Sequence, residues 1–199
     1  MFLLTLTFWQ KLEHWDQQLF KILNSEWTNS FFDSLMPYLR NSVYWAPLYL
    51  FVFVFIVINY KVKGIWWIVG LLCTVALTDM TGTNVFKHTI HRLRPCNEPG
   101  LGFQVRLLLK QCSGGYSFIS NHAANHFAMA TFFFITFRAV FKKWAWISFA
   151  WAALICYSQI YVGVHYPLDV LAGAGVGLAW GYLMATAFGK RFGFSIFGN

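Results

Sequence analysis

Three short clusters of polar residues interrupt a chain that is otherwise strongly apolar. The first runs from position 87 to 95, the second covers 120–122, and the third runs from 158 to 169. Polar and ionisable residues beside apolar segments are costly in lipid and usually mark function. The candidate functional side chains in these clusters include Lys87, Arg94, Ser120, Asn121, His122, Gln159, His165 and Asp169.

The residues of the first two clusters suit an anionic group such as phosphate. Arginine can grip phosphate oxygens through two parallel hydrogen bonds, whereas lysine acts as a point charge. Ser120 occupies a position typical of a helix N-cap, and the backbone amides after it would be free donors for an anion. Taken alone, Lys87 and Arg94 are explained equally well as anchors for lipid headgroups.

The histidines and the aspartate add nucleophilic and acid–base chemistry. His122 and His165 can titrate near neutral pH, so one can attack phosphorus while the other protonates the leaving oxygen. Asp169 follows His165 by four residues, close enough to hold one ring nitrogen and leave the other free. A lone histidine is more often structural, but this combination of residue types favours phosphoryl transfer.

The elements that position these clusters are expected to cross a membrane. The 199 residues are 58% hydrophobic and only 11% charged, against about 25% charged in soluble domains. A span needs roughly 20 apolar residues, and the blocks that qualify are 43–60, 64–83, 122–141, 144–161 and 168–188. We therefore expect an all-α, polytopic transmembrane helix bundle with about five spans, forming a single domain over residues 1–199. The last block carries Gly173, Gly177 and Gly181, a stripe that allows close helix packing.

The order of the spans brings the polar clusters to one side of the membrane. The second span ends, the third begins, the fourth ends and the fifth begins on the same face. The clusters at 87–95, 120–122 and 158–169 should therefore meet at interface depth, although they are far apart in the sequence.

Basic residues predict which face this is. Seven of them lie in short segments at the opposite face, with no acidic residue among them: Lys61, Lys63, Arg138, Lys142, Lys143, Lys190 and Arg191. The positive-inside rule makes their side cytoplasmic. Residues 1–42 and the active-site loop 84–121 then face outward, which is the periplasm for a bacterial inner membrane. Orientation and anionic headgroups explain the net charge of +8 better than nucleic acid binding does, so no nucleic-acid partner is expected.

Residues 8–23 differ from the apolar blocks. Phe8, Leu12, Trp15, Leu19 and Leu23 recur at three- and four-residue steps, and Gln10, Lys11, Glu13, Asp16, Gln17 and Lys21 fill the other face. The pattern predicts an amphipathic helix that lies flat in the membrane interface. The alternative is a helix packed against its own bundle.

The polar clusters also match the motifs of a known family. Lys87 is followed after six residues by Arg94 and Pro95, and Ser120-x-His122 follows. The third cluster reads Ser-x6-His165-x3-Asp169. Together, in this order, the motifs resemble those of the type-2 phosphatidic acid phosphatase superfamily, which also includes vanadium haloperoxidases.

The resemblance implies a role for each matching residue. His165 would be the nucleophile that forms a phosphohistidine, Asp169 would orient it, and His122 would be the general acid. Lys87, Arg94 and Ser120 would bind the phosphate oxygens and stabilise the transition state. No cofactor and no metal ion are expected, and the sequence offers no convincing set of metal ligands.

Two positions depart from the family pattern. The second motif usually reads Pro-Ser-Gly-His, but Ile119 and Asn121 flank the serine here. The third motif usually has arginine after its serine, and here that position is Gln159, which can donate a hydrogen bond but carries no charge. Asn121 and Gln159 are kept as phosphate-binding candidates, and Arg92 is a candidate to compensate for the missing charge.

The sequence therefore predicts a metal-independent lipid phosphate or diphosphate phosphatase. Undecaprenyl diphosphate, phosphatidylglycerophosphate, phosphatidate and the phosphates of lipid A are candidate substrates, and the sequence does not choose between them. Two alternatives stay open: a lipid-to-lipid phosphotransferase, and a transporter or non-catalytic lipid-binding relative. Nothing in the sequence indicates the oligomeric state.

Two cysteines of the outward loop, Cys96 and Cys112, are candidates for a disulfide. The periplasm is oxidising, so such a bond can persist there. Closing the loop of fifteen intervening residues is worth roughly 3 kcal/mol in the chain-entropy model. The bond would hold the segment after Arg94 near the segment that leads to Ser120.

Overall fold

The computed structural model describes residues 7–192, and throughout this part of the chain the regular structure is helical. The α-helices are α1 (Phe8–Lys21), α2 (Ser30–Arg40), α3 (Ala46–Met80), α4 (Asn121–Phe141), α5 (Ile147–Tyr161) and α6 (Pro167–Phe192). A π-helical segment, Thr81–Lys87, prolongs α3, and short 3-10 turns cover Ser42–Trp45, Pro95–Asn97 and Lys142–Trp146. The all-α fold expected from the sequence is confirmed.

Within residues 7–192, three helical stretches are long and apolar enough to cross a membrane: Ser42–Lys87, Asn121–Tyr161 and Pro167–Phe192. The first has 46 residues, about 69 Å of helix against a hydrocarbon core of about 30 Å. The chain reverses at Lys61 (φ 52°) inside α3 and again at Lys142 (φ 50°) after α4. These reversals lie between the expected blocks, so the first two stretches are each long enough for two passes; the count of five spans stays a prediction.

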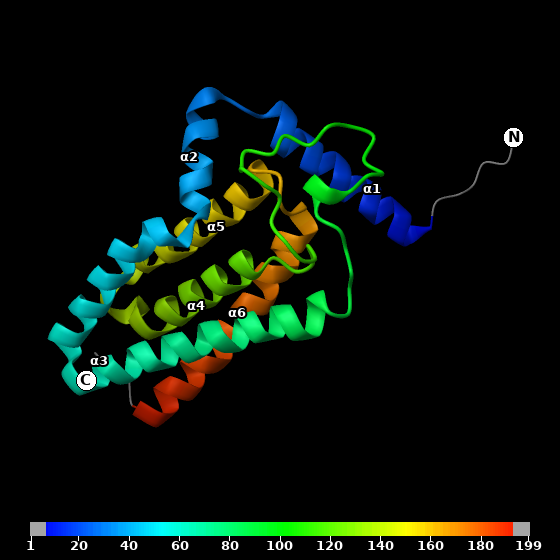
Figure 1. The fold of residues 1–199 in the computed structure, drawn as a ribbon. Helices are drawn as coiled ribbons and strands as arrows, with labels where there is room; N and C mark the ends of the chain where they lie inside the picture. The colour runs from blue at the N-terminus through cyan, green and yellow to red at the C-terminus, as the bar shows by residue number, and fades with distance from the viewer. Residues whose placement is uncertain (1–6, 193–199) are drawn as a thin grey trace, which may run out of the picture.

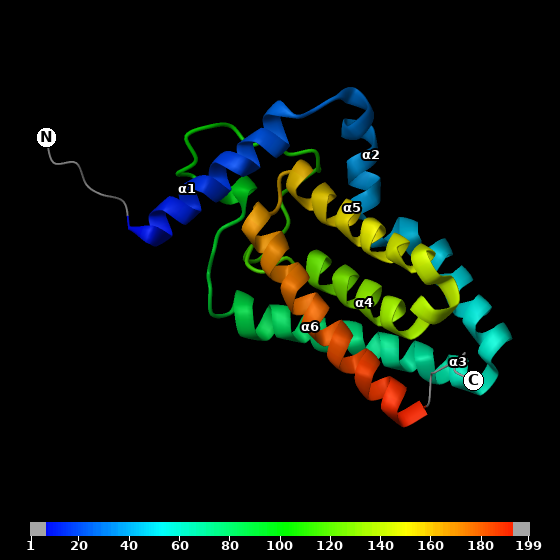
Figure 2. The ribbon, with the colours of Figure 1, turned by 180° about the vertical axis from the view of Figure 1, so that it is seen from behind.

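Helix α4 is the centre of the bundle and packs against α3, α5 and α6 (Figure 1). The glycine stripe of α6 lies on the α4 backbone, as the spacing indicated. A Cβ at Gly173 would stand 2.5 Å from the Ser120 carbonyl oxygen, and one at Gly181 would stand 2.7 Å from that of Ala128. Figure 2, which shows the molecule from the other side, has α6 in front and beside α4. The close contact fixes the start of α4, which carries the second polar cluster, against the start of α6.

Replacing Gly177 with alanine is expected to lower the free energy of unfolding by about 1–3 kcal/mol, the usual cost of overpacking. The added Cβ would collide with the Ala124 carbonyl and lie 2.9 Å from the Ala128 nitrogen. Gly175 lies on the same helix with nothing within 4 Å of its Cβ position. Gly175→Ala should therefore be neutral or stabilising. Thermal unfolding in detergent compares the two, and equal shifts would contradict the packing role.

One end of the bundle is covered by α1, α2 and the loop before α4 (Figures 1 and 2). Helix α1 begins with a capping box, in which the Thr7 side chain accepts from the Gln10 amide and the Gln10 side chain accepts in return. The exposed aromatic residues of α1 include Trp9 and Trp15, at 74% and 76% exposure. The amphipathic helix is confirmed, and its place in the membrane interface stays a prediction.

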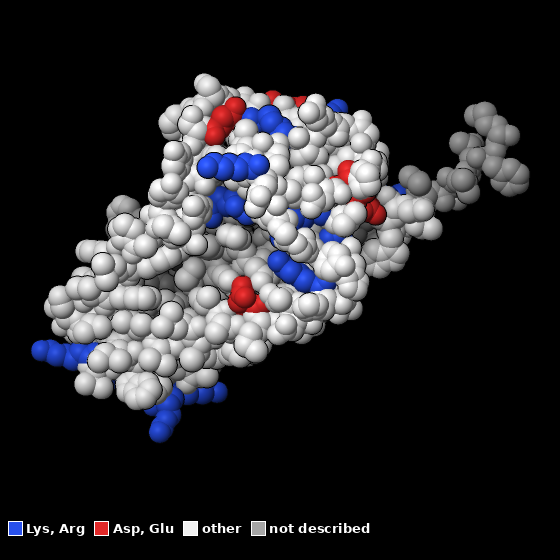
Figure 3. Space-filling view, in the orientation of Figure 1, with Lys and Arg blue, Asp and Glu red and all other residues white. Residues whose placement is uncertain are grey.

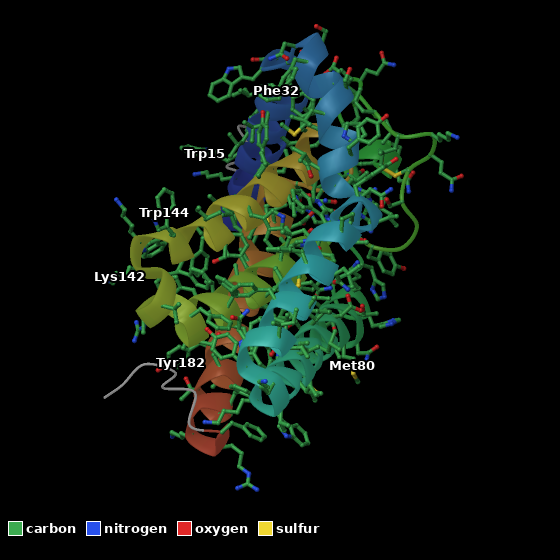
Figure 4. All side chains as sticks on the ribbon, turned by 90° about the vertical axis from the view of Figure 1, so that its left-hand side faces the viewer. Trp15, Phe32, Met80, Lys142, Trp144 and Tyr182 are labelled. Carbon is green, nitrogen blue, oxygen red and sulfur yellow. A yellow bond between two sulfur atoms is a disulfide. The ribbon has the colours of Figure 1, made fainter. Side chains whose placement is uncertain are left out.

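The polar face of α1 differs from the expectation at one residue. Asp16, grouped with the water-facing residues, is only 4% exposed and points into the protein beside Phe20, which is fully buried. Its carboxylate accepts hydrogen bonds from the Arg92 side chain and the Leu168 amide. These contacts offset the cost of burying the charge. Helix α1 thus packs on the bundle through one edge, which buries Phe20, and leaves Trp9 and Trp15 outside, as Figure 4 shows for Trp15.

Lys61, Lys142 and the last turn of α6 lie at the end of the bundle opposite α1, where Figure 3 shows Lys and Arg side chains projecting. Trp144 and Lys142 extend from the surface at this end (Figure 4). A cluster of large apolar side chains fills the interior between α3, α4 and α6, with Trp67, Phe132 and Phe188 among its members. The separation of basic and active-site ends agrees with the predicted orientation, which stays a prediction.

Candidate active site

The third cluster forms a tight turn between α5 and α6. Gly163 takes a φ of 91°, and a Cβ there would stand 2.8 Å from the Arg106 carbonyl oxygen, so the position requires glycine. Pro167 then opens α6, which places Asp169 in its first turn. The turn and the helix together bring His165 and Asp169 side by side in the interior, at 2% and 0% exposure.

The Asp169 carboxylate is bound on both oxygens. Its Oδ1 accepts from Arg92 at 2.7 Å, and its Oδ2 accepts from the Tyr166 amide at 2.9 Å and from the Ser117 hydroxyl. The His165 Nδ1 lies 3.5 Å from the same Oδ2. The carboxylate can therefore hold the proton on Nδ1 and leave Nε2 with a free lone pair, as the orienting acid of a hydrolase does.

Arg94 faces the other ring nitrogen of His165. Its Nη1 lies 3.0 Å from Nε2 and also donates to the Val164 carbonyl at 3.0 Å. The Nε and Nη2 atoms donate to the backbone of residues 114 and 115. The guanidinium is thus held beside Nε2, within reach of the oxygens of a phosphate whose phosphorus is attacked by that nitrogen.

Burial lowers the pKa of His165 to about 4, and the nearby charges of Arg94 and Lys87 lower it further, while Asp169 opposes them. The imidazole is therefore neutral at physiological pH, the form needed by a nucleophile. Because Arg94 contacts this ring, the first and third clusters share one site, as the span order predicted.

The ring of His165 should stay neutral at pH 5.5, where an ordinary histidine is protonated. Long-range nitrogen-15 NMR of labelled protein in detergent would detect this, with His165→Gln used to assign the signal. A histidine whose folded pKa is depressed contributes stability above pH 6.5, and this is lost as the pH falls toward 4. Titration of this signal near pH 6.5 would contradict the buried, neutral ring.

The start of α4 joins the same site. Ser120 is the N-cap of α4, with its Oγ 3.4 Å from the Ala123 nitrogen, and its amide donates to the Asp169 carbonyl at 3.0 Å. The charges of Arg40, Lys87 and His165 all act on His122, two residues further along. The structure thus brings His122, His165, Asp169, Lys87, Arg94 and Ser120 together, and their roles stay proposals.

Asn121 is directed elsewhere. Its Nδ2 donates to the Asp79 carboxylate at 2.9 Å and to the Thr83 hydroxyl at 2.8 Å, both at the end of α3 and in the π-helical segment after it. Its amide therefore joins helices, which leaves its predicted contact with phosphate without support from this geometry.

A cavity of about 480 Å³ opens between α3 and α4 beside His122. Asp79, Asn125 and His126 form a polar part of its wall, and Phe53, Leu71 and Met129 form an apolar part. A second, almost wholly apolar cavity of about 330 Å³ shares Tyr49 and these three apolar residues with it. Figure 3 shows a hollow in this face, bordered by basic side chains and an acidic one. The two cavities together suit an amphiphilic ligand.

A model of the PAP2 superfamily matches residues 64–192, which include all three polar clusters. The chain belongs to the PAP2 superfamily. The resemblance to type-2 phosphatidic acid phosphatases is therefore confirmed, and with it the activity class, a metal-independent lipid phosphatase. Within residues 7–192, no group of three or more His, Cys, Asp and Glu side chains gathers where it could hold a metal ion.

Two curated relatives and one solved structure are similar to this PAP2 protein. A lipid A 4'-phosphatase of Bacteroides thetaiotaomicron is 32% identical over 77% of this chain and 68% of the relative. An undecaprenyl-diphosphatase of Sulfolobus acidocaldarius is 30% identical over 78% of this chain and 70% of the relative. The fold resembles that of the transmembrane PAP2 type phosphatidylglycerolphosphate phosphatase from Bacillus subtilis (TM-score 0.68, 21% identity), covering 91% of this chain and 88% of that one.

Arg92, the candidate to compensate for Gln159, is directed at two carboxylates in this PAP2 site. Its Nη1 binds Asp169, and its Nη2 binds Asp16 of α1 at 2.6 Å. Asp16 also accepts from the Leu168 amide at 2.9 Å. Both carboxylates are buried and form ion pairs with Arg92, which neutralise its charge. Arg92 therefore holds the Asp169 carboxylate in place and does not face a phosphate.

Sequence reasoning missed Asp16, Ser117 and Arg40 as members of the PAP2 site. Ser117 lies just before the second motif and binds Asp169 through its hydroxyl. Arg40 ends α2, a helix not predicted, and its Nε donates to the Gln159 Oε1 at 3.0 Å. The only sequence signal for α2 was an asparagine N-cap before an apolar run, and Asn29 does cap it.

Cys96 and Cys112 form a disulfide, with Cα atoms 5.9 Å apart. Cys73 and Cys156 are free. Alkylation of unreduced, unfolded protein should therefore label two of the four cysteines, as read by mass spectrometry. Replacing both loop cysteines with serine should lower stability by about 3 kcal/mol. Labelling of all four cysteines would show that the disulfide is absent from the protein. It would also weaken the argument that the loop faces outward.

Proposed function

We propose that this PAP2 protein hydrolyses a phosphorylated lipid through a phosphohistidine on His165. The observation that carries the proposal is the placement of one imidazole between Asp169 and Arg94. Asp169 faces Nδ1 at 3.5 Å, and Arg94 faces Nε2 at 3.0 Å. A neutral ring held this way is a nucleophile with an anion-binding cation in front of its lone pair.

The reaction has two steps. Nε2 of His165 attacks phosphorus, the bond from phosphorus to the lipid oxygen breaks, and His122 gives its proton to that oxygen. His122 then takes a proton from water, which attacks the phosphohistidine and releases inorganic phosphate and free His165. As the phosphate binds, Arg94 moves its hydrogen bond from Nε2 to a phosphate oxygen, and in both steps Arg94, Lys87 and Ser120 bind the phosphate oxygens.

The proposed substrate is a glycolipid phosphate of the lipid A class. The relative from Bacteroides thetaiotaomicron is named a lipid A 4'-phosphatase. In the cavity wall, the Asn125 Oδ1 is buried and accepts no hydrogen bond from any residue in the described range. A sugar hydroxyl next to the scissile phosphate would satisfy it, and acyl chains would fill the adjoining apolar cavity. Undecaprenyl diphosphate is the second candidate, on the likeness to the archaeal relative.

The proposed location is a bacterial inner membrane, with the site facing the periplasm. Three observations support it: the apolar stretches, the disulfide at the active-site end and the basic residues at the other end. Labelling of single-cysteine variants in intact cells with a membrane-impermeant reagent tests the orientation.

Phosphate release from a panel of lipids tests the function. Purified protein in detergent with chelator is given lipid A, undecaprenyl diphosphate, phosphatidylglycerophosphate and phosphatidate, with His165→Gln as control. Fastest release from lipid A supports the proposed substrate. Faster release from undecaprenyl diphosphate would show that this lipid, and not lipid A, is the preferred substrate. Loss of donor phosphate without release of inorganic phosphate would indicate a lipid-to-lipid phosphotransferase. Binding without turnover would indicate a non-catalytic relative.

A further inference from the structure

We propose that Arg40 binds the substrate phosphate, and that Gln159 is the positioning residue that holds it there. A guanidinium from α2 thereby supplies the charge that the third motif lacks. The proposal rests on the proposed function, because it assigns one more phosphate contact to the same site.

The contact between the two side chains explains why position 159 carries glutamine. Gln159 is fully buried on α5, and its Oε1 accepts from the Arg40 Nε at 3.0 Å. Its Nε2 reaches back to the Ile155 carbonyl at 3.5 Å, which orients the amide oxygen toward Arg40. An arginine at 159 has no acceptor, so it could not hold Arg40 in this way.

Arg40 is placed among the residues proposed for catalysis. Its charge acts on both His122 and Arg94. The Nη2 atom donates to the Ser113 hydroxyl at 2.8 Å, in the segment next to the backbone oxygens that hold Arg94. An anion between Arg94 and Arg40 would therefore lie between the proposed nucleophile and the proposed acid.

Neither Arg40 nor Arg94 has a carboxylate within 4.0 Å among the residues described, whereas Arg92 and Arg106 do. Burial and then the Arg40 charge lower the pKa of Arg94. Arginine stays charged at neutral pH, so two guanidinium groups of the site, Arg94 buried and Arg40 partly buried, repel each other. A bound phosphate would neutralise both, which is a reason for their placement.

Helix α2 is fixed to the turn that carries His165, so the position of Arg40 is not incidental. Met36 of α2 is buried with Tyr161, Val162 and Val164 of that turn. The Tyr161 hydroxyl also donates to Asp33 of α2 at 2.6 Å. These contacts set Arg40 and the third motif in one rigid unit.

The test moves the guanidinium from one side chain to the other. Arg40→Gln is expected to lower kcat/KM by roughly 10²-fold or more, in the range found for removing one charge-stabilising donor. It should also weaken inhibition by orthovanadate at least tenfold. Arg40→Lys should retain part of both. Gln159→Arg alone should also lose activity, since it removes the acceptor and adds a further cation beside Arg40. The double variant Arg40→Gln/Gln159→Arg should recover at least tenfold over Arg40→Gln.

Arg138, which lies near the end of α4 away from the site, provides the matched control, and Arg138→Gln should leave kcat/KM within twofold of the wild type. Activity within twofold for Arg40→Gln, with unchanged vanadate inhibition, would overturn the proposal.

Thermal stabilisation by vanadate tests the binding role of Arg40 even without turnover, because the wild type should be stabilised more than Arg40→Gln. Equal stabilisation overturns the role of Arg40, whereas a wild type inactive on every lipid overturns only the proposed function. If Arg40→Gln does not fold, the lysine variant and the double variant supply the same comparison.

Discussion

Replacing His165 with alanine is expected to reduce phosphate release by about four orders of magnitude or more. The change removes the atom that forms the bond to phosphorus, and such losses in hydrolases are of this size. It should leave substrate binding largely in place, because Arg94 and Lys87 are still present. The measurement is single-turnover phosphate release by purified protein, with phosphohistidine trapped from the wild type by acid-free quenching.

The control for this change is His14→Ala, which removes a histidine from an exposed position of α1 and should leave turnover unchanged. His165→Gln keeps a hydrogen-bonding side chain beside Arg94 and serves as a second variant if alanine disturbs the fold. Activity near that of the wild type in either His165 variant would sink the proposed mechanism.

Replacing Asp16 with alanine is expected to destabilise the protein by about 3–5 kcal/mol, the usual cost of removing one member of a buried ion pair. Arg92 would lose one of its two carboxylates, and the Leu168 amide at the start of α6 would lose its acceptor. Activity should fall as well, because Arg92 also binds Asp169. Thermal unfolding and phosphate release in the same detergent would measure both effects.

Glu26 offers the matched control for Asp16. Its ion pair with Lys21 is exposed, at 3.5 Å, and pairs of that kind contribute at most about 1 kcal/mol. Asp16→Asn keeps an oxygen for the Leu168 amide and should fall between the two. A loss for Asp16→Ala no larger than that for Glu26→Ala would show that α1 is not anchored through this contact.

The apolar blocks and the shared face of the polar clusters were predictable from sequence because both depend on local composition and order. The extension of α3 as a π-helical segment to Lys87 was not, since it depends on contacts such as the one between Thr83 and Asn121. Helix α2 has 11 residues and contains Pro37, so neither its length nor its composition marks it as a helix.

The missed site residues share one property, which is that their partners are distant in the chain. Arg40 and Gln159 are 119 residues apart, and Asp16 and Arg92 are 76 apart. An aspartate on the polar face of an amphipathic helix looks solvated when only its neighbours are considered. Gln159 looked like a lost charge, because the sequence alone could not show which other side chain lies against it.

The position of the cavity beside His122, between apolar helices, determines the concentration scale on which reaction rates should be expressed. It is lined by α3 and α4, the helices of two membrane-crossing stretches, and adjoins an apolar cavity between the same helices. If the proposed function holds, a lipid enters the cavity beside His122 by sideways diffusion, with its chains still in the bilayer. The relevant concentration is then a two-dimensional one, the mole fraction of substrate in the membrane or micelle. Diluting the substrate with inert lipid at a constant bulk amount should slow the enzyme, whereas diluting the whole suspension with buffer should not.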